Sequence, residues 1–334
     1  MVRGTITTFC CLLFALPLLA EEPPATVLKS KSLEVLVYST DFEKGFYRGT
    51  RFDWAGIWGQ VNFQGHKVFT KWKPNHDPLG HDDVFGPAQE FSSSEPLGYR
   101  EAKVGEPFLK IGIGDLEKPK EEKYDFTNRY KILNYGERAF QTDEISVRYL
   151  HRLKSKTGHH YEYTKKVMIE KDAPNVVWVM HSLLNTGEKT IETDVYNHNF
   201  FNVDSDAIGR NYEIALSFKP TITEQKERAK ELLKVEGTTL TFTGALDQGT
   251  IYAEMTGFPV GKLKDPKKDG YIPDFRMRHL KTGIAVGVWC DQPITKFRLW
   301  GTQTALCPEP FLAVKAEPGK RFNWTWRYEF AMGE

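Results

Sequence analysis

Alternation of apolar and polar residues, with a period of two, runs through most of the chain after Leu33 and constrains the fold more than any other feature. Successive side chains of a β-strand point to opposite faces of its sheet, so this period is typical of half-buried antiparallel strands. It recurs over residues 145–153 and 161–169. Near the C-terminus one face of such a stretch is entirely aromatic: Trp324, Trp326, Tyr328 and Phe330. We therefore predict an all-β protein, built as a large antiparallel β-sandwich of two stacked sheets.

Two other segments have different patterns. Residues 176–180 are apolar on both faces and lead to the turn-like string Asn185-Thr186-Gly187-Glu188, which predicts a central strand that enters a turn. Residues 224–235 are the one stretch that favours a helix, because Thr221 stands three residues before Glu224 in the spacing of a capping box. We expect this helix to be an excursion between strands.

The first twenty residues have the pattern of a secretory signal peptide: Arg3 precedes an apolar run that extends to Leu19, and polar residues follow Ala20. The run is shorter than the roughly 18 to 20 apolar residues of a membrane-spanning helix, and no later stretch approaches that length. We predict that residues 1–20 are a signal peptide, that the protein is secreted or periplasmic, and that it has no membrane span. Residues 33–332 are predicted to form a single domain.

Composition narrows the class of partner. Lys and Arg number 45 and Asp and Glu 44, so no large net charge attracts the protein to nucleic acid or to an anionic membrane. Aromatic residues make up 13% of the chain, which suits stacking against sugar rings and favours a mono- or oligosaccharide partner. Beyond the signal peptide Cys290 and Cys307 are the only pair that could form a disulfide. We expect no metal site, because two scattered thiols do not form one.

A histidine and a glutamate from distant segments are the candidates for catalysis. His198 follows an alternating stretch and is flanked by Asn197 and Asn199, whose amides are suited to hydrogen bonding a hydroxylated ligand. Glu309 lies between two prolines, which favours a rigid backbone. A sugar ring that opens and closes at its anomeric carbon needs one acid and one base. The alternative interpretations are a histidine hydrogen-bonded within a sheet and a solvated turn glutamate.

Two further segments supply candidate substrate contacts. Within residues 46–54, Arg48, Arg51 and Asp53 stand among aromatic residues, a combination suited to sugar hydroxyls or to the carboxylate of a uronate. Gln89 and Glu90 follow the turn-forming pair Gly86-Pro87 and are predicted to contact substrate. An aromatic strand with surface charges is the alternative interpretation of the first segment.

The two catalytic candidates also carry a family resemblance. The string Asn197-His198-Asn199-Phe200-Phe201-Asn202 resembles the Asn-His-Thr-Tyr-Phe-Asn string of aldose 1-epimerases, in the galactose mutarotase-like family. Cys307-Pro308-Glu309-Pro310 is similar to the family's Cys-x-Glu-Pro. The order also matches, with the histidine at mid-chain after an Asn-Thr-Gly-Glu turn and the glutamate near the C-terminus. The resemblance spans residues 33–332 and is closest over 176–218 and 296–330.

The resemblance implies a fold, an activity and two residue roles. The fold would be the family's antiparallel supersandwich, and the activity the interconversion of sugar anomers without a cofactor. His198 would protonate the ring oxygen as general acid, and Glu309 would accept the proton of the anomeric hydroxyl as general base. These roles require a charged imidazole, which a neighbouring carboxylate would favour. If the two groups lie across one open cleft, with space between them for a pyranose, that arrangement would strongly favour the enzyme over the other hypotheses.

One family feature is missing from this sequence. Epimerases carry an earlier histidine in a His-Gly element, and the corresponding region here reads Pro96-Leu97-Gly98-Tyr99-Arg100. His76 and His81, in polar stretches nearby, are possible substitutes, and a solvated polar loop is the alternative. The missing histidine motivates a second hypothesis, a non-catalytic glycan-binding module or an accessory part of a polysaccharide-degrading system. A polysaccharide lyase or hydrolase is the third hypothesis.

Overall fold

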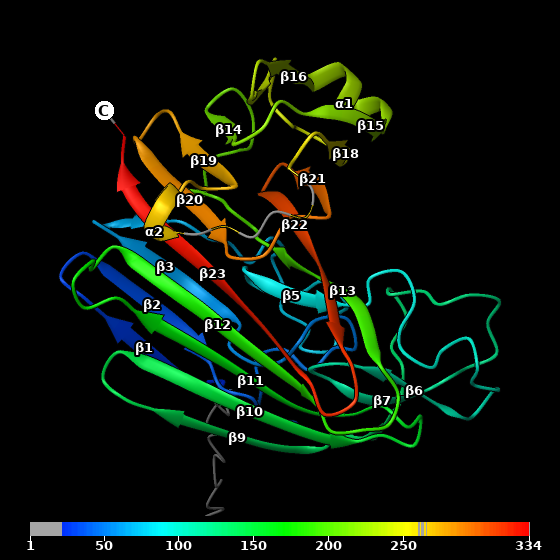
Figure 1. Cartoon of the computed structure of the whole chain (residues 1–334). Coiled ribbons are helices and arrows are strands. Elements are labelled where there is room, and N and C mark those ends of the chain that lie inside the picture. The colour runs from blue at the N-terminus through cyan, green and yellow to red at the C-terminus, as the bar shows by residue number, and fades with distance from the viewer. Residues whose placement is uncertain (1–21, 260, 262–263, 265, 334) are drawn as a thin grey trace, which may run out of the picture.

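The computed structural model describes residues 22–259, 261, 264 and 266–333, which form four antiparallel sheets and two short helices (Figure 1). The prediction of an all-β antiparallel sandwich is confirmed. The helices are α1 (Glu227–Leu232) and α2 (Pro266–Asp269). The predicted signal peptide, residues 1–20, lies outside the described residues.

The largest sheet has ten strands in the order β16-β17-β14-β19-β20-β23-β12-β11-β10-β9. Figure 1 shows its long strands β10, β11, β12 and β23 lying side by side. Their bounds, in sheet order, are β16 (Leu233–Glu236), β17 (Thr239–Phe242), β14 (Tyr212–Leu216), β19 (Phe275–His279), β20 (Ile284–Cys290), β23 (Arg321–Met332), β12 (Val176–Asn185), β11 (His160–Ile169), β10 (Ser146–Lys154) and β9 (Glu137–Thr142). The apolar segment 176–180 is the start of β12, which pairs on both sides, so the predicted central strand is confirmed.

The second sheet has six strands in the order β15-β18-β21-β22-β13-β5 and carries both catalytic candidates. Its members are β15 (Thr221–Gln225), β18 (Ile251–Thr256), β21 (Lys296–Thr302), β22 (Ala305–Ala316), β13 (Ile191–His198) and β5 (Ala88–Phe91). Strands β13 and β22 pair directly, with Tyr196 opposite Phe311. This pairing joins mid-chain to C-terminal sequence and brings the two family-like motifs together.

Two small sheets complete the fold. One is β1 (Ala25–Lys29), β2 (Leu33–Tyr38), β3 (Trp58–Phe63) and β4 (His66–Lys67). The other is β6 (Pro107–Lys110), β7 (Gly114–Glu117) and β8 (Ile132–Asn134). Strand β1 pairs with β2 along its whole length, so the sheet begins ahead of residue 33.

Aromatic side chains dominate the interior. The predicted face of β23 is fully buried, with Trp324, Trp326, Tyr328 and Phe330 each 0% exposed. Burial of one large apolar side chain contributes about 1.5–3 kcal/mol, so this face is a major source of stability. A second, smaller apolar cluster includes Phe52, Phe108, Phe200 and Cys307, with Trp72 and Trp300 packed against it. This second cluster supports the candidate site described below.

The predicted helix over residues 224–235 is largely wrong. Residues 221–225 form β15, which pairs with β18, and α1 is confined to Glu227–Leu232. Thr221 is therefore a strand residue, and the N-cap of α1 is Lys226, which makes no side-chain capping bond. Pairing with β18 gives backbone N–H and C=O groups of residues 221–225 their hydrogen-bond partners. In a longer helix these groups would have bonded to one another instead.

The structure also answers what the sequence left open about the cysteines. Cys290 in β20 and Cys307 in β22 belong to different sheets, and both are buried free thiols. Over the described ranges, no helix combines the length and the apolar character needed to cross a membrane.

Candidate active site

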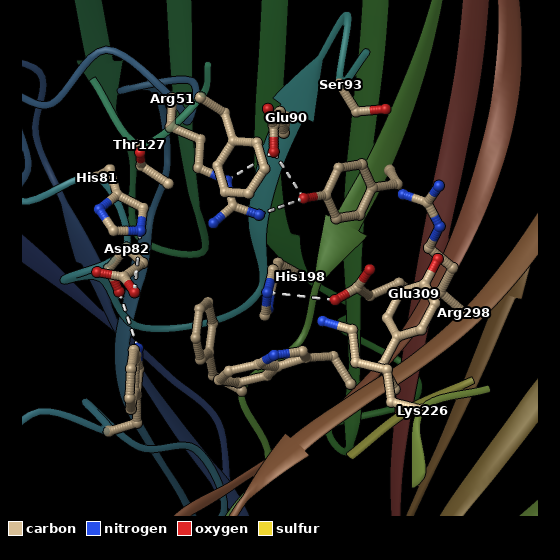
Figure 2. Close-up of a pocket in the computed structure, with 16 residues that line it drawn as sticks. Arg51, His81, Asp82, Glu90, Ser93, Thr127, His198, Lys226, Arg298 and Glu309 are labelled. Atoms are coloured by element: carbon tan, nitrogen blue, oxygen red, sulfur yellow. Dashed lines mark hydrogen bonds and ion pairs between the residues drawn. The ribbon is translucent and has the colours of Figure 1, made fainter. Parts of the chain in front are cut away.

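A cavity of about 370 Å³ opens beside β13 and β22 and contains both catalytic candidates (Figure 2). Aromatic rings and charged side chains share its lining. The lining residues are Arg51, Trp72, His81, Asp82, Glu90, Ser93, Phe126, Thr127, Tyr196, His198, Phe200, Lys226, Tyr252, Arg298, Trp300 and Glu309. Apolar walls with a few convergent polar groups are typical of small-molecule sites.

His198 and Glu309 touch each other in this cavity. Nε2 of His198 lies 3.2 Å from Oε1 of Glu309, and both side chains are almost completely buried. His198 is the last residue of β13, and Glu309 lies within β22 opposite Arg298 of β21. Because the two groups are in contact, a pyranose does not fit between them. A ligand would lie over the pair rather than between its members.

Two buried asparagines of the His198 motif form hydrogen bonds to the Glu309 motif and to β23. Asn199 donates from Nδ2 to the carbonyl oxygen of Pro308 at 2.6 Å and accepts from the Tyr328 hydroxyl at 2.9 Å. Asn197 donates to the same hydroxyl at 2.8 Å. Both amides are at most 1% exposed and lie away from the cavity lining. The predicted substrate contacts of Asn197 and Asn199 are corrected: these amides position the backbone on either side of the pair.

Close packing fixes the imidazole of His198. Its ring stacks on Phe200 at 4.0 Å between centroids, and Trp300 meets it edge-on at 5.4 Å. Phe200 has a φ of 39°, a left-handed conformation that is uncommon outside glycine. Behind it, a Cβ on Gly86 would lie 2.2 Å from the carbonyl oxygen of Asn199, so only glycine fits there. The histidine is held in one orientation by rings and backbone.

Burial sets the charge state of the pair. Desolvation raises the pKa of Glu309 to about 8. Desolvation also lowers the pKa of His198 well below its usual value, and the positive charge of Arg51 lowers it further. At neutral pH these shifts favour a protonated Glu309 beside a neutral His198. This is the reverse of the charged imidazole that the predicted roles require, because the adjacent carboxyl is itself neutralised by burial.

Arg51 and Glu90, two of the predicted substrate contacts, line the cavity, and the carboxylate of Glu90 already has partners within the protein. Its Oε2 accepts from Arg51 Nε at 2.8 Å and from the Tyr196 hydroxyl at 2.6 Å, and its Oε1 lies 3.2 Å from Lys110 Nζ. Burial alone raises the pKa of Glu90, but the charges of Arg51 and Lys110 outweigh burial and leave the pKa below its ordinary value. Glu90 is thus a buried anchor that orients Arg51 and Tyr196.

Three other predicted contact residues lie outside this cavity. Asp53 is 1% exposed and pairs with Lys165 Nζ at 2.8 Å. Gln89 is also buried, with its Nε2 2.9 Å from Nε2 of His181. Arg48 lines a separate cavity of about 230 Å³. The prediction that these three residues contact sugar in this site is therefore corrected. A segment of aromatic and charged residues has the same sequence pattern whether its side chains line a cleft or are buried in the core.

Of the two possible substitutes for the missing family histidine, His81 is the one that lines the cavity. It lies on the wall opposite Glu309, beside Asp82, whose Oδ2 is 3.3 Å from His81 Nε2 (Figure 2). Asp82 also contacts Lys73, and its backbone carbonyl accepts from Trp72 Nε1 at 2.9 Å. The other possible substitute, His76, instead bonds the carbonyl oxygen of Phe46 at 2.7 Å. Across the part of the chain that the structure describes, no group of three or more metal-ligating side chains is found.

Sequence reasoning missed most of the lining. Arg298 and Trp300 stand two residues apart on β21 and so share a face, a signal that period-two alternation could have provided. Trp72, Phe126 and Thr127 come from loops that carry no regular pattern, and Lys226 and Tyr252 come from the β15–α1–β18 region. Only the folded chain brings these segments to one cavity.

Comparisons with known proteins bear on the fold. No family model matches this sequence, and no curated protein does. A galactose mutarotase-like protein from Clostridium acetobutylicum superimposes with a TM-score of 0.56 at 11% identity, covering 92% of this chain and 94% of that one. The GalM/aldose epimerase homologue from C. elegans gives a TM-score of 0.52 at 10% identity, covering 93% and 100%. The fold is that of the galactose mutarotase-like proteins.

The galactose mutarotase-like architecture extends over nearly the whole chain. The Slr1438 protein from Synechocystis sp. PCC 6803 superimposes with a TM-score of 0.56 at 10% identity, covering 96% of this chain and all of that one. The fold implied by the two sequence motifs is therefore confirmed. At these identities the likeness concerns architecture, and the chemistry has to be argued from the side chains themselves.

Proposed function

We propose that this chain is an exported aldose 1-epimerase-like enzyme, which interconverts the anomers of a free sugar with His198 and Glu309 as its acid–base pair. The observation that carries the proposal is the contact between these two groups on the lining of an aromatic-walled cavity. The galactose mutarotase-like fold supports it. Each positioned acid or base accelerates proton transfer by about 10² to 10⁴.

The neutral pair suggests how the ring opens. Protonated Glu309 gives its proton to the ring oxygen, while His198 Nε2 takes the proton of the anomeric hydroxyl. The bond between C1 and the ring oxygen breaks, and the former hydroxyl oxygen becomes the aldehyde carbonyl. Rotation about the bond from C1 to C2 then presents the other aldehyde face. Closure reverses both transfers, so each group acts as acid in one direction and as base in the other.

Adjacency of the two groups suits this chemistry. The anomeric oxygen and the ring oxygen are bonded to the same carbon, so they are close neighbours and can meet two catalytic atoms that lie 3.2 Å apart. After ring opening Glu309 is a carboxylate and His198 an imidazolium. The guanidinium of Arg51 favours that carboxylate, since its charge opposes the rise in the pKa of Glu309 that burial causes.

Glycoside hydrolysis fits the same cavity less well. It requires two carboxyl groups on either side of the scissile bond, one of them free to act as nucleophile or base. The two other carboxyl groups of the lining already have partners: Glu90 is bonded to Arg51, Lys110 and Tyr196, and Asp82 contacts Lys73 and His81. Asp53 is paired with Lys165 outside the cavity. Anomer interconversion needs one acid and one base, which in this proposal are His198 and Glu309.

Wild-type protein should accelerate the approach to anomeric equilibrium of at least one free sugar. A panel of freshly dissolved hexoses, pentoses and uronic acids would be followed by polarimetry and by exchange NMR of the anomeric protons. A matched sample of heat-denatured protein serves as the control for buffer catalysis. Saturable sugar binding without any rate increase across the panel would contradict the proposal and favour a glycan-binding module.

The pH dependence of the rate provides a separate prediction. We expect a plateau that extends below pH 6.5 and a decline above about pH 8, because the pKa of Glu309 is raised to about 8 and its proton is lost there. On the acid side the lowered pKa of His198 keeps the imidazole able to accept a proton. The two apparent values belong to the coupled pair. A rate that rises through pH 8 would contradict the assignment of Glu309 as the initial proton donor.

A further inference from the structure

Positive charge exceeds negative charge around the cavity, and the excess is localised. Three charged lining groups are matched by partners just outside the lining: Asp82 by Lys73, Glu90 by Lys110, and Arg298 by Glu254. Burial keeps Glu309 protonated, so it adds no negative charge at neutral pH. Arg51 and Lys110 share the single carboxylate of Glu90, so these three groups together carry one positive charge, and Lys226, whose side chain is exposed, is a second cation in the lining.

Arg51 has a role at the reacting end. Its guanidinium is held by Glu90 and Tyr196 and packs over the rings of Phe52 and Phe126, at 4.6 and 4.4 Å from their centroids. Its charge acts on both His198 and Glu309. It is therefore placed to stabilise the carboxylate that ring opening creates, and it is not available for a distant part of the ligand.

Lys226 is the remaining cation. It begins α1, its backbone is fixed by a hydrogen bond from its N–H to the carbonyl oxygen of Tyr252 at 3.0 Å, and its ammonium lies 5.6 Å from the centroid of the Tyr252 ring. Among the described residues no carboxylate pairs with its Nζ. Figure 2 shows Lys226 and Arg298 on the same side of the cavity as Glu309, with His81 and Asp82 on the opposite side.

The position of Lys226 relative to Glu309 indicates which substituent of the sugar Lys226 would contact. If Glu309 protonates the ring oxygen, then C5, which is bonded to that oxygen, and the C6 group that it carries lie on the Glu309 side. Lys226 and Arg298 are the charged groups there. One unmatched positive charge suits a substituent with one negative charge, and a carboxylate also accepts hydrogen bonds from both an ammonium and a guanidinium.

We propose that the substrate is a sugar acid, a hexuronate whose C6 carboxylate is bound by Lys226 with the help of Arg298. This inference rests on the proposed anomer interconversion and names its substrate class. Arg298 keeps its Nε bond to Glu254 at 2.9 Å, which leaves the outer nitrogens of the guanidinium for the ligand. The ammonium of Lys226 and the guanidinium of Arg298 lie 5.6 and 5.8 Å from the centroid of the Tyr252 ring, so both cations are close to one aromatic side chain of the cavity.

The test compares sugars that differ only at C6, using the full-length exported protein and Lys226→Met. Anomer exchange of galacturonate and glucuronate would be measured by NMR beside galactose, glucose and their 6-phosphates. We expect kcat/KM to be roughly three- to tenfold higher for a uronate than for the matching hexose, and the preference to disappear in Lys226→Met. Lys230→Met, on the outer part of the same helix, is the matched control and should retain the preference.

Each outcome separates this inference from the proposed function. Catalysis of neutral hexoses without a uronate preference, or a preference that survives in Lys226→Met, overturns the sugar-acid assignment and leaves the epimerase proposal standing. A preference for the 6-phosphates overturns the assignment to a carboxylate. If no sugar is turned over, the epimerase proposal fails, and calorimetric titration with galacturonate and galactose decides the inference. Tighter uronate binding that depends on Lys226 supports it, and equal binding overturns it.

Discussion

A Glu309→Gln protein is expected to fold normally and to lose about two to four orders of magnitude in kcat for anomer exchange. Glutamine has nearly the same shape as the protonated glutamate that burial favours, so the cavity should be preserved. Its amide cannot deliver a proton to the ring oxygen. Exchange NMR of the anomeric protons at saturating sugar measures the loss, and KM should change far less than kcat because the sugar's other contacts remain.

A matched control for this change lies on the strand that carries His198. Glu192 also belongs to β13, but it is exposed and pairs with Lys315 at 3.2 Å, so Glu192→Gln removes a carboxylate without touching the cavity. It should keep the wild-type rate. The decline above pH 8 should also vanish from the residual activity of Glu309→Gln. Full activity in Glu309→Gln would remove this residue from the mechanism.

Glu90→Gln is expected to lower the free energy of unfolding by about 3–5 kcal/mol. The carboxylate of Glu90 is 1% exposed and lies between Arg51 and a completely buried Lys110. Without it, the ammonium of Lys110 stays in the interior with only backbone carbonyls as partners, and an uncompensated buried charge is costly. Urea denaturation followed by tryptophan fluorescence measures the difference in unfolding free energy.

Two further variants identify the cause of that loss. Glu90→Gln combined with Lys110→Met removes both buried charges and should recover a large part of the stability, since an apolar replacement of a buried pair is often near neutral. Glu117→Gln removes one partner of an exposed ion pair with Lys131 and should cost about 0–1 kcal/mol. A Glu90→Gln protein as stable as Glu117→Gln would show that the Arg51–Glu90–Lys110 cluster does not support the fold.

Strand alternation predicted the all-β architecture because the buried face of a strand can be recognised from the alternating residues of that strand alone. Each of the four aromatic residues of β23 points to the same face, and that face can be recognised without knowledge of its partner. The segment 221–235 was misjudged for the opposite reason. Its first residues adopt β structure because β18 pairs with them, and β18 lies about thirty residues further along the chain. A capping-box spacing carries no information about that distant strand.

Two candidate residues of the site could be proposed from the sequence, whereas their surroundings could not. Two family-like motifs identified His198 and Glu309, and the pairing of β13 with β22 places them in contact. The charge states of His198 and Glu309 depend on how deeply the two side chains are buried. The depth of burial cannot be read from a sequence motif. Asn197 and Asn199 were assigned to the ligand because amides suit hydroxyl groups. In the fold their partners are Tyr328 and the backbone of Pro308, far along the chain.

Proton transfer and ligand discrimination are assigned to different parts of this polypeptide. His198 and Glu309 belong to two paired strands whose geometry is locked by buried amides and stacked rings. Lys226 and Tyr252 belong to the β15–α1–β18 excursion at the upper end of Figure 1. Exchange of residues in that excursion could redirect the same chemistry toward sugars with other substituents at C6. Retargeting of this scaffold, in evolution or by design, would then leave its most tightly packed region untouched.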